Sequence, residues 1–306
     1  MEEYYSFDYA NVHFICLDSM TQSRATNGPM ANWLRLDLAA TTNQWLIAYW
    51  HHPPYTIGSH YSDNIYEPEM WEMRQNIVPI LEAGGVDLVL CGHSHIYERS
   101  YLLHGHYGFS ATLQPSMILD QGSGRENDTG AYIKHTSGPL ANLGTVYVEV
   151  GCSASLAEEY DVYGRHPVMF YSELQIGSLV VDINSNRLDA VFLCDTGAIH
   201  DSFTILKGKA APFRICNLIL NKGKAILKWK SVPGQAYRVE LTDDLQGSVW
   251  RPASDPITAV GFTTAWTNVM IPSPIYLFRV VQLPPEPPKG TAVKVKGAVP
   301  ENSNQG

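Results

Sequence analysis

Two stretches of the chain decide the fold: residues 45–55, which read WLIAYWHHPPY, and residues 86–95, which read VDLVLCGHSH. Each begins with a short and almost uninterrupted apolar run, which is typical of a strand buried on both faces of a sheet. Each ends in histidines. Ligands of open α/β sheets gather at the carboxyl ends of the strands. If these two strands are neighbours, both histidine groups therefore lie at one edge of the sheet.

The residues around the two strands predict alternating strands and helices. Apolar side chains recur at helical spacing in residues 29–40, where Pro29 suits a helix start, and in residues 68–83. Residues 4–8 and 11–17 are aromatic and β-branched runs that predict a hairpin. Strands separated by helices of this length indicate βαβ units and an α/β fold.

The pattern changes after residue 101 to strands and turns. Residues 122–143 are rich in Gly, Asn, Asp, Thr and Ser and predict a long loop. Further strands are expected at residues 145–150, 178–183, 188–193 and 202–206.

The chain is expected to contain two folded parts and a tail. Residues 1–208 form the α/β part, and residues 212–284 contain short strands at regular spacing that predict a small β-sandwich. Residues 285–306 are rich in Pro, Lys and Gly without an apolar period, so we expect a disordered tail.

Composition narrows the classes of partner. The 306 residues carry a formal net charge of −9, which argues against nucleic acid as a partner. We expect no membrane span, because no apolar run is long enough, and residues 1–5, which read MEEYY, are not expected to belong to a signal peptide. The sequence has five cysteines. The first four lie in apolar surroundings without CxxC spacing, so buried thiols are expected there rather than a zinc cluster, with a Cys152–Cys194 disulfide left open.

The histidines at the two strand ends predict metal chemistry. His93 and His95 are two residues apart, so in a loop each could reach a different member of a metal pair. Imidazole is a ligand for Zn, Fe and Mn. Metal pairs can hold both the attacking and the leaving oxygen in a phosphate displacement.

These segments resemble a known family. Residues 45–55 and 92–100, the latter reading GHSHIYERS, are similar to the fourth and fifth motifs of calcineurin-like metallophosphoesterases. The Tyr-Glu-Arg at residues 97–99 points to the purple acid phosphatase branch. The resemblance extends over residues 1–207 and implies a metallophosphoesterase-type β-sandwich flanked by helices. Residues 212–284 look like immunoglobulin- or fibronectin-like modules.

The resemblance also implies roles for individual residues. It makes His51 and His93 ligands of one metal and His95 a ligand of the other. It makes His60 a catalytic residue that faces the substrate and protonates the leaving group, which suits an imidazole near neutral pH.

Two further residues are assigned to substrate binding. His52 would line the pocket or support its loop, and Arg99 would contact phosphate. For Arg99, a structural ion pair with Glu98 or with another carboxylate is the alternative.

The function expected from the resemblance is hydrolysis of phosphomonoesters by an acid phosphatase-like enzyme. Its cofactor would be a dinuclear centre of Fe with Zn, Mn or a second Fe, and its partner a phosphorylated small molecule. A phosphodiesterase or nucleotide hydrolase of the same fold is one alternative. A non-catalytic secreted binding protein with a relic site is another. By the same resemblance the location is secreted, periplasmic or at the cell surface.

The sequence departs from the family's pattern in one respect. The first three family motifs, which include Gly-Asp-x-x-Tyr and Gly-Asn-His-Glu/Asp, do not occur in the 306 residues. Those motifs carry the bridging carboxylate, without which two adjacent cations repel. We therefore expect a truncated chain that binds metal weakly and has little phosphatase activity by itself.

Overall fold

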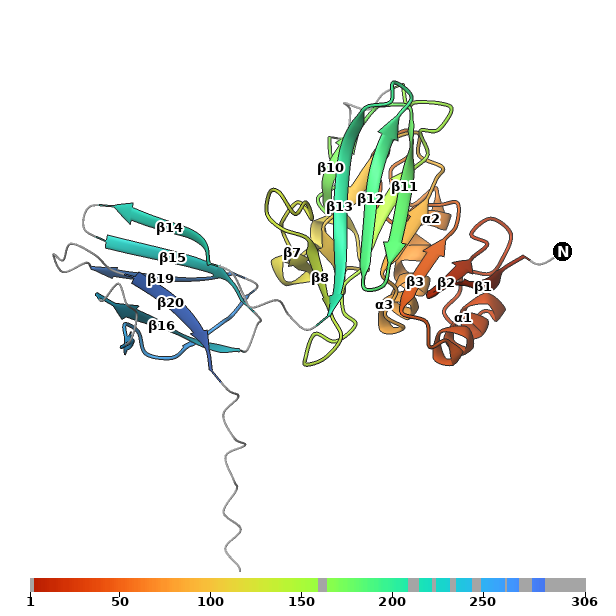
Figure 1. Cartoon of the computed structure of the whole chain (residues 1–306). Helices are drawn as coiled ribbons and strands as arrows, with labels where there is room; N and C mark the ends of the chain where they lie inside the picture. The colour runs from red at the N-terminus through yellow and green to blue at the C-terminus, as the bar shows by residue number, and fades with distance from the viewer. Residues whose placement is uncertain are drawn as a thin grey trace, which may run out of the picture. The chain divides into compact units, whose positions relative to one another are not determined.

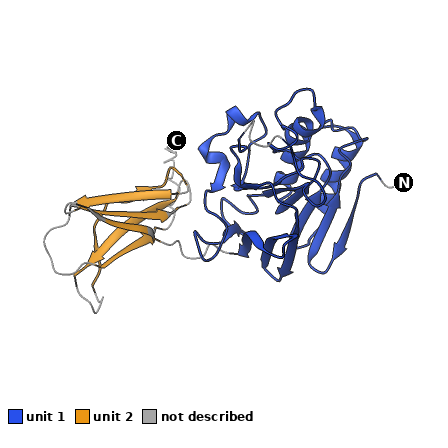
Figure 2. Ribbon diagram, turned by 90° about the horizontal axis from the view of Figure 1, so that it is seen from above, with its two compact units in different colours: residues 1–213 blue, residues 214–306 orange. Residues whose placement is uncertain are grey.

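The computed structural model describes residues 3–158, 164–208, 215–221, 224–231, 235–243, 249–261, 263–269 and 277–283. The chain divides into two compact units, Met1–Phe213 and Arg214–Gly306 (Figure 2). The tail expected at residues 285–306 lies outside the described residues.

The first unit is built around a seven-stranded sheet with the order β1-β2-β3-β4-β9-β5-β10. Strands β2, β3, β4 and β9 are parallel neighbours, and the remaining pairs are antiparallel. The strands are β1 (Tyr5–Tyr9), β2 (Val12–Cys16), β3 (Trp45–Tyr49), β4 (Leu88–Cys91), β5 (Tyr97–Ser100), β9 (Val146–Val150) and β10 (Met169–Glu173). The predicted hairpin at the start of the chain is β1 and β2, joined at Ala10, which has φ 52°.

Helices cover one face of this sheet. Helix α1 spans Pro29–Ala40, the range that the apolar spacing predicts, and Pro29 lies in its first turn. The single helix expected at residues 68–83 consists of α2 (Pro68–Glu72), the π-helical η1 (Met73–Ile77) and α3 (Val78–Ala83). Pro79 has no backbone N–H to donate to the preceding turn, which is a physical reason for the break in the α-helical ladder.

A second, four-stranded sheet has the order β11-β12-β13-β8. Its strands are β8 (Tyr132–His135), β11 (Gly177–Asn184), β12 (Arg187–Cys194) and β13 (Ile199–Gly208). The loop expected at residues 122–143 is thus partly wrong, because β8 lies within it and pairs parallel with β13. Only four residues long and containing Lys134, β8 lacks the apolar alternation that marks a strand in sequence.

The two sheets pack face to face, as predicted for the α/β sandwich. In Figure 1 the strands β11, β12 and β13 lie over the first sheet. Trp45 and Ile47 of β3 share a buried cluster with Phe192 of β12 and Ile205 of β13. A separate buried cluster on the other face joins the first sheet to the helices and contains Leu34, Ala48, Ile77 and Val89. The strands that end in histidines are therefore held from both sides.

A buried ion pair network also fixes the start of β4. Asp87 is 0% exposed, and its carboxylate lies 2.8 Å from Nζ of Lys134 and 2.7 Å from Nζ of Lys207. The two lysines come from β8 and β13, so the network joins the second sheet to the strand that leads into the histidines.

The remaining elements of the first unit are short. They are β6 (Leu102–Leu103), β7 (Ile118–Asp120) and the 3-10 turns η2 (Ser110–Thr112) and η3 (Pro115–Met117). The four cysteines whose side chains are described, Cys16, Cys91, Cys152 and Cys194, are free thiols.

The described part of the second unit contains strands in two sheets. Three of them, β14 (Ile215–Asn221), β15 (Lys224–Lys230) and β19 (Thr263–Val269), form one sheet. A second sheet is centred on β16 (Ala236–Thr242), which pairs with β17 (Arg251–Pro252), β18 (Ile257–Thr258) and β20 (Leu277–Gln282). The buried side chains of this unit include Trp229, Tyr237 and Val239.

Candidate metal centre

The two histidine segments lie side by side at one edge of the sheet. Strands β3 and β4 are parallel neighbours, with Tyr49 opposite Leu90. Beyond their ends, the Gly92 amide donates a hydrogen bond to the His51 carbonyl at 3.1 Å. Strands β3 and β4 are therefore neighbours, as the position of the two histidine groups at one sheet edge requires.

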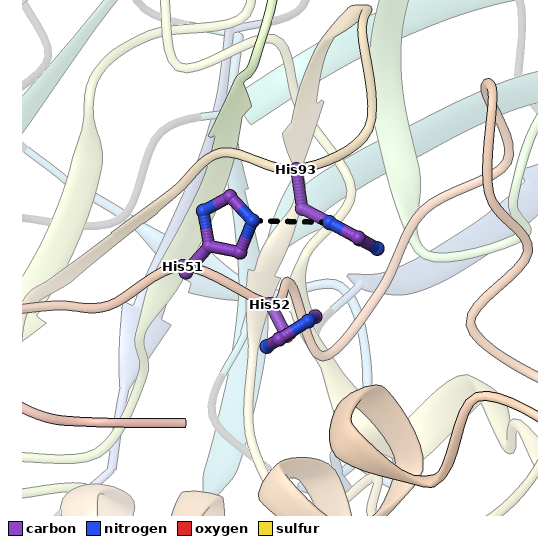
Figure 3. A group of neighbouring side chains, drawn as sticks. All are labelled: His51, His52 and His93. Carbon is purple, nitrogen blue, oxygen red and sulfur yellow. Dashed lines mark hydrogen bonds between the residues drawn. The ribbon is translucent and has the colours of Figure 1, made fainter. Parts of the chain in front are cut away.

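Three imidazoles meet at this edge, from His51, His52 and His93, which we call the imidazole group (Figure 3). Nε2 of His51 lies 3.0 Å from Nδ1 of His93. The ring centroids of His52 and His93 are 4.4 Å apart. One ligand nitrogen from each histidine lies within 4.8 Å of the other two, so the group can hold one cation.

Backbone strain accompanies the placement of His93. Its φ of 76° lies in the left-handed region, which is unfavourable for a residue with a Cβ atom. The chain on the other side of this loop is packed closely against it, since a Cβ atom at Gly58 would lie 2.4 Å from Oγ of Ser94. Close packing of this kind holds a strained residue in place.

His52 is fixed by Ser19, a residue that no motif in the sequence marks. The Ser19 hydroxyl lies 2.9 Å from Nδ1 of His52 and also accepts a hydrogen bond from the His52 amide. The side chain of His52 is buried. Ser19 follows β2 in a loop without any motif, so only its position in the fold links it to the site.

Burial keeps the imidazole group neutral. Desolvation, with help from neighbouring histidines, lowers the pKa of His93 to about 4. Desolvation likewise lowers the pKa of His52 to about 4, and it lowers the pKa of His51. Neutral imidazole is the form that binds a metal, so these histidines need not lose a proton to do so.

His60 lies beside the same group and is held by a carboxylate. Its Nδ1 lies 2.7 Å from Oε2 of Glu67, and its ring stacks on His93 with centroids 3.8 Å apart. Asn64 donates a hydrogen bond to Oε1 of Glu67 at 2.9 Å. The structure therefore brings His60, Glu67 and His93 together as a second set of potential ligands.

His95 stands apart from both sets among the described residues. Its amide donates to Oγ of Ser59 at 2.9 Å, and its carbonyl accepts from the Ala157 amide at 2.7 Å. Its side chain is half-buried, and its charge contributes to lowering the pKa of His51. The expected role of His95 as a ligand of a second metal stays a prediction.

The expectation that Arg99 binds substrate needs correction. Arg99 is 0% exposed, and its guanidinium donates two hydrogen bonds to Asp201, at 2.5 and 2.8 Å. A third hydrogen bond goes to Tyr132, and the Phe170 and Phe203 rings lie over the guanidinium. Arg99 therefore belongs to the interior of the sandwich, and the alternative of a structural ion pair holds, with Asp201 as the carboxylate.

Glu98 is a buried residue that binds the loop leading to His60. It is buried and accepts hydrogen bonds from the Thr56 hydroxyl at 2.6 Å and from the Ile57 amide at 3.1 Å. Burial raises the pKa of Glu98 to about 7, although these hydrogen bonds act in the opposite direction. Glu98 thus fixes the start of the loop that carries His60.

The described residues fit a metal centre in part. Within them, the two sets of potential ligands share His93, and neither contains a carboxylate that also reaches His95. His51 and His93 suit one cation, while a bridge to a second cation is not formed by the described side chains.

Comparison with known proteins agrees with these motifs. Residues 3–97 match the calcineurin-like phosphoesterase family. Purple acid phosphatase 18 of Arabidopsis thaliana is 39% identical over 100 residues, which are 32% of this chain and 22% of that protein. Purple acid phosphatase 15 of the same plant is 30% identical over 139 residues, 44% of this chain and 24% of that protein. The matches span less than a quarter of the length of these curated relatives.

The fold is also found in a solved structure. The purple acid phosphatase PPD1 from yellow lupin seeds aligns with 67% of this chain and 33% of its own chain, at a TM-score of 0.50 and 20% sequence identity.

Proposed function

We propose that this chain, which contains a calcineurin-like phosphoesterase domain with purple acid phosphatase homologues, serves in the metal-dependent hydrolysis of phosphomonoesters. The observation that carries the proposal is the meeting of His51 and His93 at the carboxyl ends of β3 and β4, with His60 beside them. Hydrolase is the activity class of the family, and the family implies a dinuclear metal centre.

His51 and His93 would hold one metal and His95 the other. When bound, the metals supply Lewis acidity toward the phosphate oxygens. The neutral state of His51 and His93 suits them as ligands, because the pKa of each is lowered. Iron with zinc, manganese or a second iron is the metal pair we propose, from the family resemblance.

His60 would protonate the leaving oxygen. Glu67 accepts a hydrogen bond from Nδ1 of His60, which orients the ring and leaves Nε2 for proton transfer. His60 is half-exposed, as a group that meets a substrate from solvent must be. His52, buried against Ser19, would line the pocket and support its loop.

The substrate would be a phosphorylated small molecule. A secreted, periplasmic or cell-surface location is part of the proposal and rests on the family resemblance. No helix in the described part of the chain is long and apolar enough to cross a membrane.

Leaving-group dependence tests the role of His60. With metal added, the chain's hydrolysis, which is expected to be slow, should be faster on p-nitrophenyl phosphate than on bis(p-nitrophenyl) phosphate. His60→Ala should lower the rate for an alkyl phosphate by about 10²-fold, since an alkoxide needs protonation to leave. The same variant should affect p-nitrophenyl phosphate much less, because nitrophenolate leaves unprotonated.

His200→Ala is the matched control. His200 forms a similar pair with Glu173, at 2.8 Å, outside the histidine groups, so its removal should change neither rate. Equal losses on both substrates in His60→Ala would refute proton donation by this residue. A preference for the diester would favour the phosphodiesterase alternative.

A non-catalytic role is the second candidate. It is favoured by the ligand sets of the described residues, which lack a bridging carboxylate next to His95. One relative, 29% identical over 99 residues, is named probable inactive purple acid phosphatase 9 of Arabidopsis thaliana. Absence of any metal-dependent hydrolysis, together with retained metal binding, would select this candidate.

A further inference from the structure

Glu67 is a carboxylate beside His60 and His93, whereas the imidazole group contains histidines alone. Its Oε2 lies 2.7 Å from Nδ1 of His60 and 3.8 Å from Nε2 of His93. One ligand atom from each of these residues lies within 4.8 Å of the other two. We propose that His60, Glu67 and His93, which we call the Glu67 group, bind a single zinc ion.

The ligand types favour zinc. Two imidazoles and one glutamate are a ligand set of catalytic zinc sites, in which the fourth position is left to water or substrate. In a tetrahedral site with bonds of about 2.1 Å, ligand atoms lie about 3.4 Å apart. The separations of 2.7 and 3.8 Å lie on either side of this value, and the ligand atoms of His60 and His93 lie within 4.8 Å of each other, so side-chain rotation would bring the three ligands around one ion.

The Glu67 group is held by neighbouring residues and is accessible to ions from solvent. Asn64 donates to Oε1 of Glu67, which orients the carboxylate and leaves Oε2 directed at the two histidines. Helix α2 begins next to Glu67, so a rigid element fixes this residue at the end of its loop. The side chains of His60, Glu67 and His93 are 33%, 31% and 20% exposed, which gives an ion access from solvent.

The Glu67 group and the imidazole group both contain His93, so a metal bound by one group competes with a metal bound by the other. Nδ1 of His93 faces His51, whereas its Nε2 faces Glu67. The imidazole group carries no negative charge to offset that of a dication, and Nδ1 of His52 already has a hydrogen bond with Ser19. The single carboxylate therefore favours the Nε2 side for the first zinc ion.

Occupancy of this site would have a consequence for hydrolysis. Zinc would hold Nδ1 of His60 in place of its hydrogen bond to Glu67, and it would occupy His93, a proposed ligand of the dinuclear centre. Zinc in excess should therefore inhibit any hydrolysis by the chain. Zinc binding itself is measured without a phosphoester, so its outcome is independent of the proposed function.

Zinc titration of the chelator-treated 306-residue chain tests the site. Calorimetry should show one zinc ion per chain. Glu67→Gln, which keeps the shape and removes the charge, should weaken binding by at least about 10-fold. Glu69→Gln is the matched control, because Glu69 is 32% exposed, near Glu67 in exposure, and pairs with Arg24 instead.

A third variant shows which of the two groups that contain His93 binds the zinc ion. His51→Ala should leave zinc affinity within a few fold, because His51 belongs only to the imidazole group. Circular dichroism and thermal unfolding check that each variant is folded. Unchanged affinity in folded Glu67→Gln, or an equal loss in His51→Ala and Glu67→Gln, would overturn the proposal.

Discussion

Residues 93–95 and residues 97–99 belong to one sequence motif but lie in different environments. His93 and His95 are partly exposed at the end of β4, in a loop with a strained backbone. Glu98 and Arg99 of β5 are 0% exposed. The difference shows that one sequence motif contains both residues of the candidate site and buried residues that support the fold, and that burial distinguishes them. Arg99 illustrates this, since its charge suggested a phosphate ligand and its environment makes it a buried partner of Asp201.

Truncating a buried side chain of this motif should have the largest effect on the free energy of unfolding. Arg99→Ala should lower the free energy of unfolding by about 3–5 kcal/mol, because Asp201 and Tyr132 lose their partner in the interior. Urea unfolding followed by circular dichroism measures this loss. Arg125→Ala is the control, since Arg125 also pairs with Asp201 but is 29% exposed, and its loss should be much smaller. Equal effects of the two substitutions would contradict the assignment of Arg99 to the core.

Glu98 should make stability depend on pH. Burial raises its pKa from 4.5 to about 7, so the folded chain holds a proton that the unfolded chain has lost. This contribution is fully present below about 4.5 and disappears as the pH rises through about 7. Relative to Glu98→Gln, wild type should therefore lose on the order of 3 kcal/mol across that window. Parallel pH profiles for wild type and Glu98→Gln would show that Glu98 is not the titrating group.

Substitution of His93, in the exposed part of the motif, should have the smallest effect on stability. His93→Gly and His93→Ala both remove the imidazole, but only glycine adopts a φ of 76° without strain. His93→Gly should therefore be more stable than His93→Ala by about 1 kcal/mol, while both lose metal. Thermal unfolding of the two variants provides the comparison. The opposite order would mean that the backbone at this position is not strained.

The sequence predicted the parts of the fold that depend on local pattern. Helix α1 agrees with its apolar spacing, and β3 and β4 agree with their continuous burial. The strand β8 was missed because its pairing with β13 is non-local. The meeting of His51 and His93 was predictable because parallel neighbouring strands end at one edge.

The partners of the histidines were not predictable in the same way. Glu67 reaches His60 only because the loop between them is folded back, and that loop is held by contacts from distant residues. Asp63, within that loop, pairs with Arg74 and accepts a hydrogen bond from the Ser110 amide. Ser19 likewise meets His52 across 33 positions of sequence. No spacing rule encodes such contacts.

The proposed metal-dependent phosphoesterase site has His51 and His93 at the ends of β3 and β4. Hydrolysis of p-nitrophenyl phosphate against metal concentration, in wild type and His93→Ala, tests it most directly. We predict that added metal raises the rate in wild type only, while both chains remain folded. Equal metal-dependent rates in the two chains would contradict the claim.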